Sequence, residues 1–517
     1  MKKSVNILIV SSFMAGFALM TVELIATRLM APYVGSSIYT WTSVIGVVLL
    51  GTAIGNYWGG IYADRHGSRE SLATLFIAAS TATFLIPLAA YFSPLLVVSG
   101  LPISVATFLL AAILFCVPAG FFGTLYPGIL KLHLQNIDAT GARSGQISAA
   151  WSLGGIMGTF LTGFYFIGYL GSTATVLAIA VVLLINAAIL FRLKKKRVLS
   201  IAVLFLIVGM MTYAMHLFTD GKGSVFVAES EYYKIRVVDS KLKDNGRVRV
   251  LFLDADAHSM EGLDGQQLDI YPEIYPIFSV INKNIHSALL LGGGSYALSK
   301  NIADFYKGAD VTTVEIDPKV QQAAEDYFRL KEYPVRAEIS DGRVFLQQTD
   351  KKYDLIFSDV YNSLISIPWH MTTIEFDRLV KSRLNPDGIY AINIIASLEG
   401  TDARLFQSMA KTFGAVFGEY YVFAYGKDAR QPQNIILVGV NGPPNMFSDA
   451  ELHEWIARLP GGEVLAKKLV AGYRVTDEKA MVLTDDHAPI ERLMAPLIED
   501  YFSKYVGIYY SVIFSRG

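Results

Sequence analysis

Long apolar stretches dominate the chain up to about residue 218, whereas apolar and polar residues are mixed from about residue 225 onward. A helix that crosses the hydrocarbon core of a membrane needs about 20 predominantly apolar residues. The stretches that reach this length are residues 5–27, 41–62, 71–93, 102–127, 145–168, 172–191 and 198–217. The pattern therefore predicts a multi-pass helical membrane domain of about seven helices over residues 1–220.

Small residues recur at every fourth position in two of these stretches. They are Gly51, Gly55 and Gly59 in the second stretch, and Ala150, Gly154 and Gly158 in the fifth. This spacing lets helix backbones approach closely in lipid, so we expect a packed bundle. Glu23 lies inside the first stretch, where a carboxylate is costly. It is either hydrogen-bonded to Thr27 or a neighbouring helix, or it marks a ligand or proton site.

After residue 286, short apolar runs alternate with segments of helical character. The expected strands are residues 286–293, 311–317, 336–340, 353–360, 388–395, 419–425 and 434–440, and the expected helices are 296–307, 318–328, 342–349, 373–384 and 402–413. This alternation predicts a mainly parallel sheet with helices on both faces. In such sheets, ligands bind beyond the carboxyl ends of the strands.

Three successive strand ends carry residues that suit a nucleoside. The first ends in the turn Gly292-Gly293-Gly294, where backbone can approach a ligand closely. Glu315 ends the second, about 20 residues further on, at a distance that suits a ribose diol. Asp341, followed by Gly342, could accept a bond from the amino group of adenine, or cap the next helix. The turn lacks a phosphate-binding lysine and the GxGxxG pattern, which favours S-adenosylmethionine over a dinucleotide.

The fourth strand end carries candidate chemistry in Asp359, Tyr361, Asn362 and His370. Asp359 follows an apolar strand and would point into the cleft. A carboxylate there could take a proton from an amine or align the amine with an electrophilic carbon. The alternatives are a structural acid for Asp359 and simple packing over the site for His370.

Composition narrows the classes of partner. The net charge of -1 gives no global positive field, so we expect no nucleic acid. We also expect no metal. Cys116 is the one cysteine and cannot form an internal disulfide, which leaves the redox compartment open.

At these residues the chain resembles the polyamine aminopropyltransferases, the spermidine synthase family. The resemblance covers roughly residues 225–440 and includes "YYKIRVVD", "RVRVLFLDADAHSM", "LLLGGG", "VEID", "DGR" and "FSDVYN", with Tyr271 and Glu273. The stretches "ELIATRLMAPYVGSSIYTW" and "LTDDHAPIERL" make the whole chain similar to the membrane-fused bacterial branch of that family.

The resemblance implies a methyltransferase-like (Rossmann-like) catalytic domain over 286–517, preceded by a small β subdomain over 225–285. It implies Asp359 as the catalytic base. The residues it implies for the nucleoside co-substrate are Gly292, Gly293, Gly294, Ser295, Glu315, Ile316, Asp341 and Gly342. Those it implies for the second substrate are Tyr233, His258, Tyr271, Tyr361, Asn362 and His370. The co-substrate would be S-adenosylmethionine or its decarboxylated form, and methylthioadenosine would leave.

The chain departs from the family pattern where cationic amines would be held. Ser295 stands where the family has an acid, and Asn362 replaces the second acid of the catalytic loop. Tyr233 stands where the family commonly has glutamine, and Pro272 stands where it commonly has histidine or glutamine. Loss of carboxylates removes charge-assisted partners for ammonium groups. Three functions therefore stay open: aminopropyl transfer to a polyamine, a reaction of intact S-adenosylmethionine by intramolecular cleavage or methyl transfer, and a non-enzymatic transporter or sensor.

Two observations disagree on the side of the membrane that holds the catalytic domain. Basic residues mark cytoplasmic ends, and they gather on one side at Lys2, Lys3, Arg65, Arg69, Lys131, Arg143 and the run Arg192–Arg197. Seven crossings then place residue 225 outside. S-adenosylmethionine is made inside cells, which favours a cytoplasmic catalytic domain in the inner membrane, and we adopt that expectation. A broken or re-entrant helix between Pro118 and Pro127 would alter the count.

The sequence does not fix the oligomeric state, and a homo-oligomer is one possibility.

Overall fold

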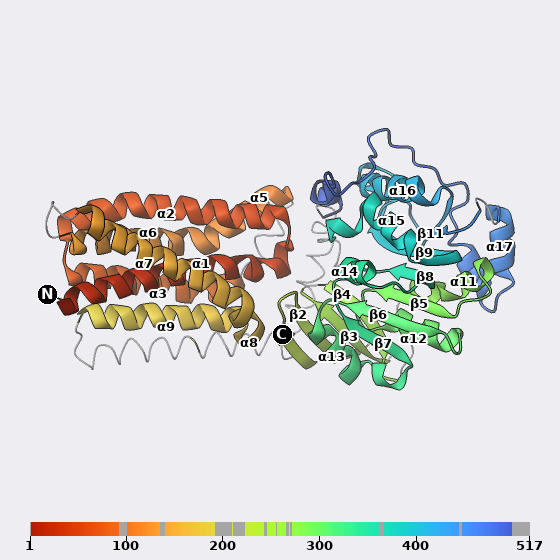
Figure 1. The fold of residues 1–517 in the computed structure, drawn as a ribbon, viewed down its shortest axis with the longest axis horizontal. Coiled ribbons are helices and arrows are strands. Elements are labelled where there is room, and N and C mark those ends of the chain that lie inside the picture. Colours follow the sequence, from red (N-terminus) through yellow and green to blue (C-terminus); the bar gives the residue numbers. More distant parts are fainter. Residues whose placement is uncertain are drawn as a thin grey trace. The chain divides into compact units, whose positions relative to one another are not determined.

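A computed structural model of the chain describes residues 2–91, 101–134, 140–191, 209, 223–241, 246–254, 256–264, 268, 271–360, 367–443 and 447–498. The described residues divide into two compact units. The first holds the residues up to 209 together with 229–233, and the second holds 223–228 and 234–498. Figure 1 labels their helices and strands.

The first unit is built from long apolar helices. They are α1 (Lys2–Val34), α2 (Ile38–His66), α3 (Arg69–Tyr91), α5 (Ile103–Ala111), α6 (Val117–His133), α7 (Thr140–Leu161), α8 (Ile167–Leu170) and α9 (Ser172–Phe191). π-helical turns at Ala112–Cys116 and Thr162–Phe166 join α5 to α6 and α7 to α8. Within the described residues, six helical spans are therefore long and apolar enough to cross a membrane. The seventh expected span, 198–217, lies outside the described residues except for Gly209, which is helical.

The small residues found in the sequence lie at helix contacts. A Cβ added at Gly55 would lie 2.0 Å from the carbonyl oxygen of Gly120, and one added at Gly154 would lie 2.0 Å from that of Phe13. These contacts pack α2 on α6 and α1 on α7 (Figure 1), which confirms the expected close approach. The suggested break between Pro118 and Pro127 is wrong, because α6 runs through Pro127 without interruption.

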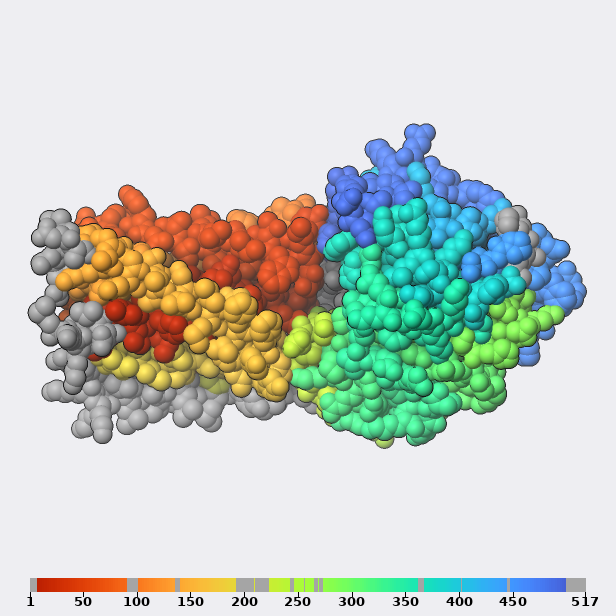
Figure 2. All heavy atoms as spheres, in the orientation of Figure 1, coloured from red at the N-terminus to blue at the C-terminus, as the bar shows by residue number. Residues whose placement is uncertain are grey.

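The outward faces of α2 and α7 are apolar. Leu49, Trp58, Leu153 and Phe160 are each more than half exposed. Figure 2 shows the surfaces of these two helices in orange and gold. Side chains of this kind on an outer face suit contact with lipid chains rather than with water.

Residues 229–233 are fixed to the helices of the first unit. Arg28 near the end of α1 donates to the carbonyl oxygens of Tyr232, at 2.6 Å, and Ser230, at 2.8 Å. The backbone N–H of Ser172, the first residue of α9, lies 3.1 Å from both carboxylate oxygens of Glu229. The N-terminus of a helix favours such a negative charge.

The second unit begins with a four-stranded sheet in the order β1-β2-β3-β4. Its strands are β1 (Ser224–Glu229), β2 (Lys234–Lys241), β3 (Arg247–Leu253) and β4 (Asp256–Gly262). Lys300 from the larger part of this unit forms a buried ion pair with Glu261 of β4, with Nζ and Oε2 2.8 Å apart. Arg329 contacts the other oxygen of the same carboxylate. Both charges of the buried pair are therefore matched, as burial requires.

A seven-stranded sheet forms the centre of the second unit, in the order β10-β11-β9-β8-β5-β6-β7. Its strands are β5 (Ser287–Leu291), β6 (Asp310–Glu315), β7 (Val335–Ile339), β8 (Tyr353–Ser358), β9 (Leu384–Ala396), β10 (Tyr420–Ala424) and β11 (Gln433–Val440). The first five are parallel to one another, and β11 is antiparallel to both of its neighbours. This confirms the expected Rossmann-like methyltransferase fold.

Helices cover this sheet. They are α11 (Tyr275–Ile281), α12 (Ala297–Phe305), α13 (Pro318–Tyr327), α14 (Gly342–Gln348), α15 (Ile374–Ser382), α16 (Arg404–Phe417), α17 (Asp449–Ala457) and α18 (Gly462–Ala466). Side chains of α11, α12 and α17 share one buried apolar cluster with the central strands. Because both faces of the parallel strands are covered, those strands are apolar along their length.

We expect the protein to be more stable at neutral pH when Asp377 in α15 is replaced by asparagine. The Asp377 side chain is 4% exposed, and burial raises its pKa well above the ordinary value. Folding then requires a proton that the unfolded chain has released, so stability falls as pH rises from the unfolded pKa toward the folded one. Thermal unfolding in detergent should show a gap between variant and wild type that widens upward from about pH 4. A gap that is constant with pH would contradict this.

Candidate active site

The turn after β5 touches the end of β8. The backbone N–H of Asp359 donates to the carbonyl oxygen of Leu291 at 2.8 Å. Gly292 has a φ of +94°, and a Cβ there would lie 2.1 Å from the carbonyl oxygen of Asp359. The positive φ of Gly292 and the lack of space beside its Cα both exclude a side chain at this position. The glycine is therefore what lets Asp359 lie beside the turn.

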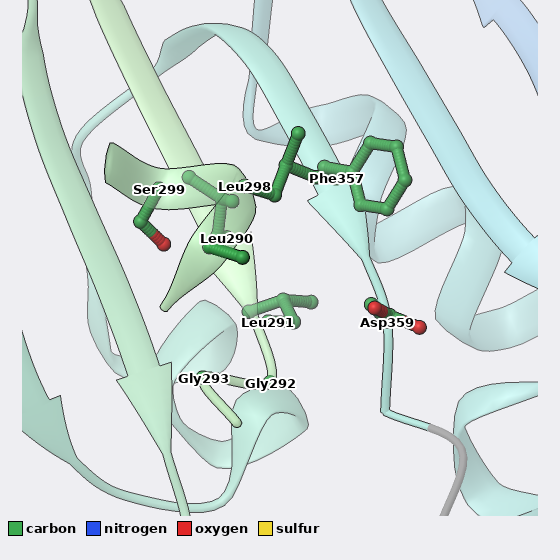
Figure 3. A pocket seen from close by; sticks show the side chains of 9 residues that line it. Leu290, Leu291, Gly292, Gly293, Leu298, Ser299, Phe357 and Asp359 are labelled. Atoms are coloured by element: carbon green, nitrogen blue, oxygen red, sulfur yellow. The ribbon is translucent and has the colours of Figure 1, made fainter. Parts of the chain in front are cut away.

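A narrow cavity lies between β5, α12 and β8, and Figure 3 shows the side chains around it. Its lining residues are Leu290, Leu291, Gly292, Gly293, Ala297, Leu298, Ser299, Phe357 and Asp359. Among these lining residues, Asp359 is the one with an acidic side chain. Two of the three turn glycines thus border the same cavity as the candidate base.

Glu315, at the end of β6, is bonded to the glycine turn. One carboxylate oxygen accepts from the backbone N–H of Gly293 at 2.8 Å, and the other accepts from that of Asp317 at 2.9 Å. The side chain is 7% exposed. Burial raises the pKa of the Glu315 carboxyl, and the backbone N–H bonds oppose part of that rise. Glu315 therefore shapes the turn, and Ile316 beside it is half-buried.

Asp341 acts as the N-cap of α14, which the sequence offered as one of its two interpretations. One carboxylate oxygen accepts from the backbone N–H groups of Arg343 and Val344, at 2.9 and 3.0 Å. The other lies 3.2 Å from Nε2 of His370. Gly342 packs closely, since a Cβ there would lie 3.0 Å from Cε of Met371. The structure thus brings His370 to Asp341 rather than to Asp359.

The sequence did not point to Asn393, which holds the candidate base. Its Nδ2 donates to Oδ1 of Asp359 at 3.0 Å and to Oδ1 of Asn434 at 3.1 Å. Asn393 is 2% exposed in the middle of β9. A polar residue inside the apolar run "YAINII" was the available signal, because buried amides need hydrogen-bond partners.

Ser295 does not line the cavity. Its side chain is 1% exposed, and its hydroxyl has no hydrogen-bond partner among the described residues. The serine that lines the cavity is Ser299, the third residue of α12. The expectation that Ser295 meets the co-substrate directly thus gains no support from its position.

The other candidate residues are scattered. His258 lies on β4, and its neighbour Ser259 lies 3.6 Å from the position of a Cβ on Gly294, so β4 lies against the glycine turn. Tyr233 is 7% exposed and directly precedes β2. Tyr271 begins a 3₁₀ turn (Tyr271–Ile274) before α11. Tyr361 and Asn362 lie outside the described residues.

Part of this unit is similar in sequence to a known family of proteins. Residues 274–425 match the family model "Spermine/spermidine synthase domain". A probable polyamine aminopropyl transferase of Bifidobacterium longum is 28% identical over 249 residues, which cover 45% of this chain and 54% of that protein. This chain thus spans about half the length of that relative. The polyamine aminopropyltransferase of Vibrio vulnificus is 27% identical over 222 residues, 41% of this chain and 72% of that protein.

One relative extends the match toward the N-terminus. Polyamine aminopropyltransferase 2 of Aquifex aeolicus is 22% identical over 397 residues, which cover 73% of this chain and 77% of that protein. That alignment is longer than the part of the chain after residue 222. Among solved structures, a probable spermidine synthase from Corynebacterium glutamicum is 19% identical, with a TM-score of 0.37, over 48% of this chain and 96% of that one.

The matched region contains β5 with its glycine turn, Glu315, Asp341, Asp359 and Asn393. The relatives from Bifidobacterium longum and Vibrio vulnificus are both named as polyamine aminopropyl transferases. The C-terminal half of this chain therefore carries a spermidine synthase domain, fused to a preceding region of long apolar helices.

Proposed function

We propose that this chain is a membrane-bound aminopropyltransferase, which moves the aminopropyl group of decarboxylated S-adenosylmethionine to a polyamine and releases methylthioadenosine. The observation that supports this most is the position of Asp359. Its carboxylate borders the glycine-lined cavity and is oriented by the buried amide of Asn393. The names of the relatives support the same class of reaction.

The proposed reaction is an in-line displacement at the aminopropyl carbon next to the sulfonium. The amine nitrogen forms a bond to this carbon while the carbon–sulfur bond breaks. The electron pair of the broken bond moves to sulfur, which leaves as a neutral thioether. The nitrogen loses a proton, which Asp359 accepts. Since the leaving group is already activated, the protein contributes mainly position and orientation of the two reactants.

The nucleoside end of the donor would be held by the two acids on the neighbouring strands. Glu315 would accept from the ribose hydroxyls, and Asp341 would accept from the amino group of adenine. Both carboxylates already have backbone partners on their loops. Each acid would thus shape its loop and also offer an oxygen to the ligand.

Product analysis tests the proposal against its alternatives. Purified full-length protein in detergent is incubated with intact or with decarboxylated S-adenosylmethionine, each with and without putrescine. The proposal expects methylthioadenosine and a longer polyamine, from the decarboxylated donor and only when putrescine is present. Methylthioadenosine from the intact donor alone would indicate intramolecular cleavage, S-adenosylhomocysteine would indicate methyl transfer, and binding without turnover would indicate a transporter or sensor.

We expect Glu315→Gln to weaken methylthioadenosine binding at least about 10-fold, because hydrogen bonds to charged groups contribute about 1.5–3 kcal/mol each. The glycine turn would also lose the carboxylate that accepts from Gly293. Titration calorimetry of the full chain measures the affinity. Glu454→Gln on α17, whose carboxylate pairs with Arg458, is the matched control. Wild-type affinity in Glu315→Gln would exclude this residue from the nucleoside site.

The membrane and its sidedness belong to this proposal. The six helical spans support a membrane-bound protein by their length and composition. Substrate supply favours a cytoplasmic catalytic domain, although the basic residues favour the outside. A reporter that is active only in the periplasm, fused after Gly517, decides between them. Strong reporter activity would refute the cytoplasmic placement.

A further inference from the structure

The motif "LTDDHAP" near the C-terminus has no role in the proposed reaction, yet it contacts both loops that carry Asp341 and His370. Thr484 and His487 close a tight turn through two backbone hydrogen bonds, at 3.1 and 3.0 Å. Asp485 lies at the tip of this turn. Its neighbours in space come from α14 and α15, far away in the sequence.

Asp485 makes three side-chain hydrogen bonds to those elements. Its two carboxylate oxygens accept from Nη1 and Nη2 of Arg343, at 2.8 and 2.5 Å, in the bidentate geometry that suits a guanidinium. The oxygen nearer Nη1 also accepts from the hydroxyl of Thr373, at 2.7 Å. The Arg343 hydrogen bonds hold the pKa of the Asp485 carboxyl below its usual range. The carboxylate is therefore charged at neutral pH.

Arg343 also contacts two residues of the candidate site, His370 and Asp341. The same Nη1 donates to the carbonyl oxygen of His370 at 2.7 Å. Its backbone N–H donates to Asp341. Nε2 of His370 lies 3.2 Å from the other oxygen of the same Asp341 carboxylate. One guanidinium thus joins the start of α14, the 3₁₀ turn Trp369–Met371 and the turn 484–487.

Exposed apolar side chains lie close in the chain to Asp341 and His370. Ile339, Val344 and Trp369 are each more than two-fifths exposed. An acid amid exposed apolar surface suits a flat heteroaromatic ring with an amino group. The loops that Arg343 joins are therefore the loops that would receive the base of a nucleoside.

We infer that Asp485 is a positioning residue for the nucleoside base: it fixes Arg343, and Arg343 holds His370 and Asp341 in the arrangement that receives the base. This inference rests on the proposed function. Asp485 acts through Arg343 and touches no reacting atom. Its loss should therefore weaken binding of the nucleoside and leave the displacement at Asp359 unchanged.

The test uses Asp485→Asn in the full-length protein in detergent, with Asp486→Asn as the control. Asp486 is the adjacent acid in the same turn and makes none of the bonds described for Asp485. We expect Asp485→Asn to raise the dissociation constant of methylthioadenosine, and the KM for the donor, about 10-fold or more, with kcat within about twofold of wild type. Asp486→Asn should match wild type. An unchanged dissociation constant in Asp485→Asn would overturn the inference.

A second readout separates this inference from the proposed function. Hydrogen exchange of the backbone amides at 341–345 and 369–373 should be faster in Asp485→Asn without any ligand, and unchanged in Asp486→Asn. Thr373→Val, which removes one of the three bonds, should have a smaller effect in the same direction. If wild type fails to bind methylthioadenosine, the proposed function fails. If exchange at these amides is unchanged in Asp485→Asn, the positioning role fails, whatever the ligand.

Discussion

Replacing Asp359 with asparagine should slow turnover at least about 100-fold, the lower range for general-base catalysis, while methylthioadenosine binds with near wild-type affinity. Asparagine keeps the shape of the side chain and an oxygen that can accept from Asn393. It cannot take the proton that the attacking amine must lose. The backbone bond from residue 359 to Leu291 is unaffected by the change, so the glycine turn keeps its place.

Steady-state kinetics and calorimetry on the same preparation check this expectation. Asp350→Asn is the control, because that carboxylate is fully exposed on the loop before β8. Wild-type turnover in Asp359→Asn would show that the base lies elsewhere. An intermediate loss would favour intramolecular cleavage of intact S-adenosylmethionine, since its own carboxylate is deprotonated at neutral pH and needs no base.

Gly292→Ala should disrupt the site as a whole, with losses of about 10-fold or more in both nucleoside affinity and turnover. An alanine at φ +94° is strained by about 1–3 kcal/mol. Its Cβ would also lie 2.1 Å from the carbonyl oxygen of Asp359, so the turn and the candidate base must separate. Both ends of the donor site would therefore lose their spacing.

Gly308→Ala is a matched control for the backbone strain. Gly308 also has a positive φ, of +86°, but a Cβ there would meet nothing within 4 Å. Both variants should lower the thermal unfolding midpoint, and only Gly292→Ala should lose affinity and turnover. Equal functional losses in the two variants would contradict the role of the close contact between Gly292 and Asp359.

Local patterns predicted most of the long elements of this chain. Apolar length identified the helical spans, and alternating runs identified the strands and most helices of the second unit, because burial of apolar surface imposes these periods directly. The short helices α11, α17 and α18 were not expected. These helices are short or weakly periodic, and their apolar residues become buried only when the helices pack on the sheet.

Proline and glycine content was a less reliable guide to the helices of the first unit. The idea of a break near Pro118 to Pro127 came from proline and glycine content, but in α6 Gly120 and Gly123 lie at close contacts with α2. Glycine in this long apolar helix thus served packing between helices rather than a bend. The side of the membrane stays a prediction, because it depends on the number of crossings along the chain.

The sequence by itself determined which residues end the parallel strands, since an apolar run followed by glycine or acid marks such an end. Gly292, Glu315, Asp341 and Asp359 were all named in this way. Only the tertiary structure decided what those side chains contact: Glu315 the glycine turn, Asp341 its own helix and His370, and Asp359 the amide of Asn393. It also decided that Ser295 is buried and that Asp485 meets Arg343. The physical reason is that strand ends follow from local burial, whereas hydrogen bonds between residues 22 to 142 positions apart depend on how whole elements pack.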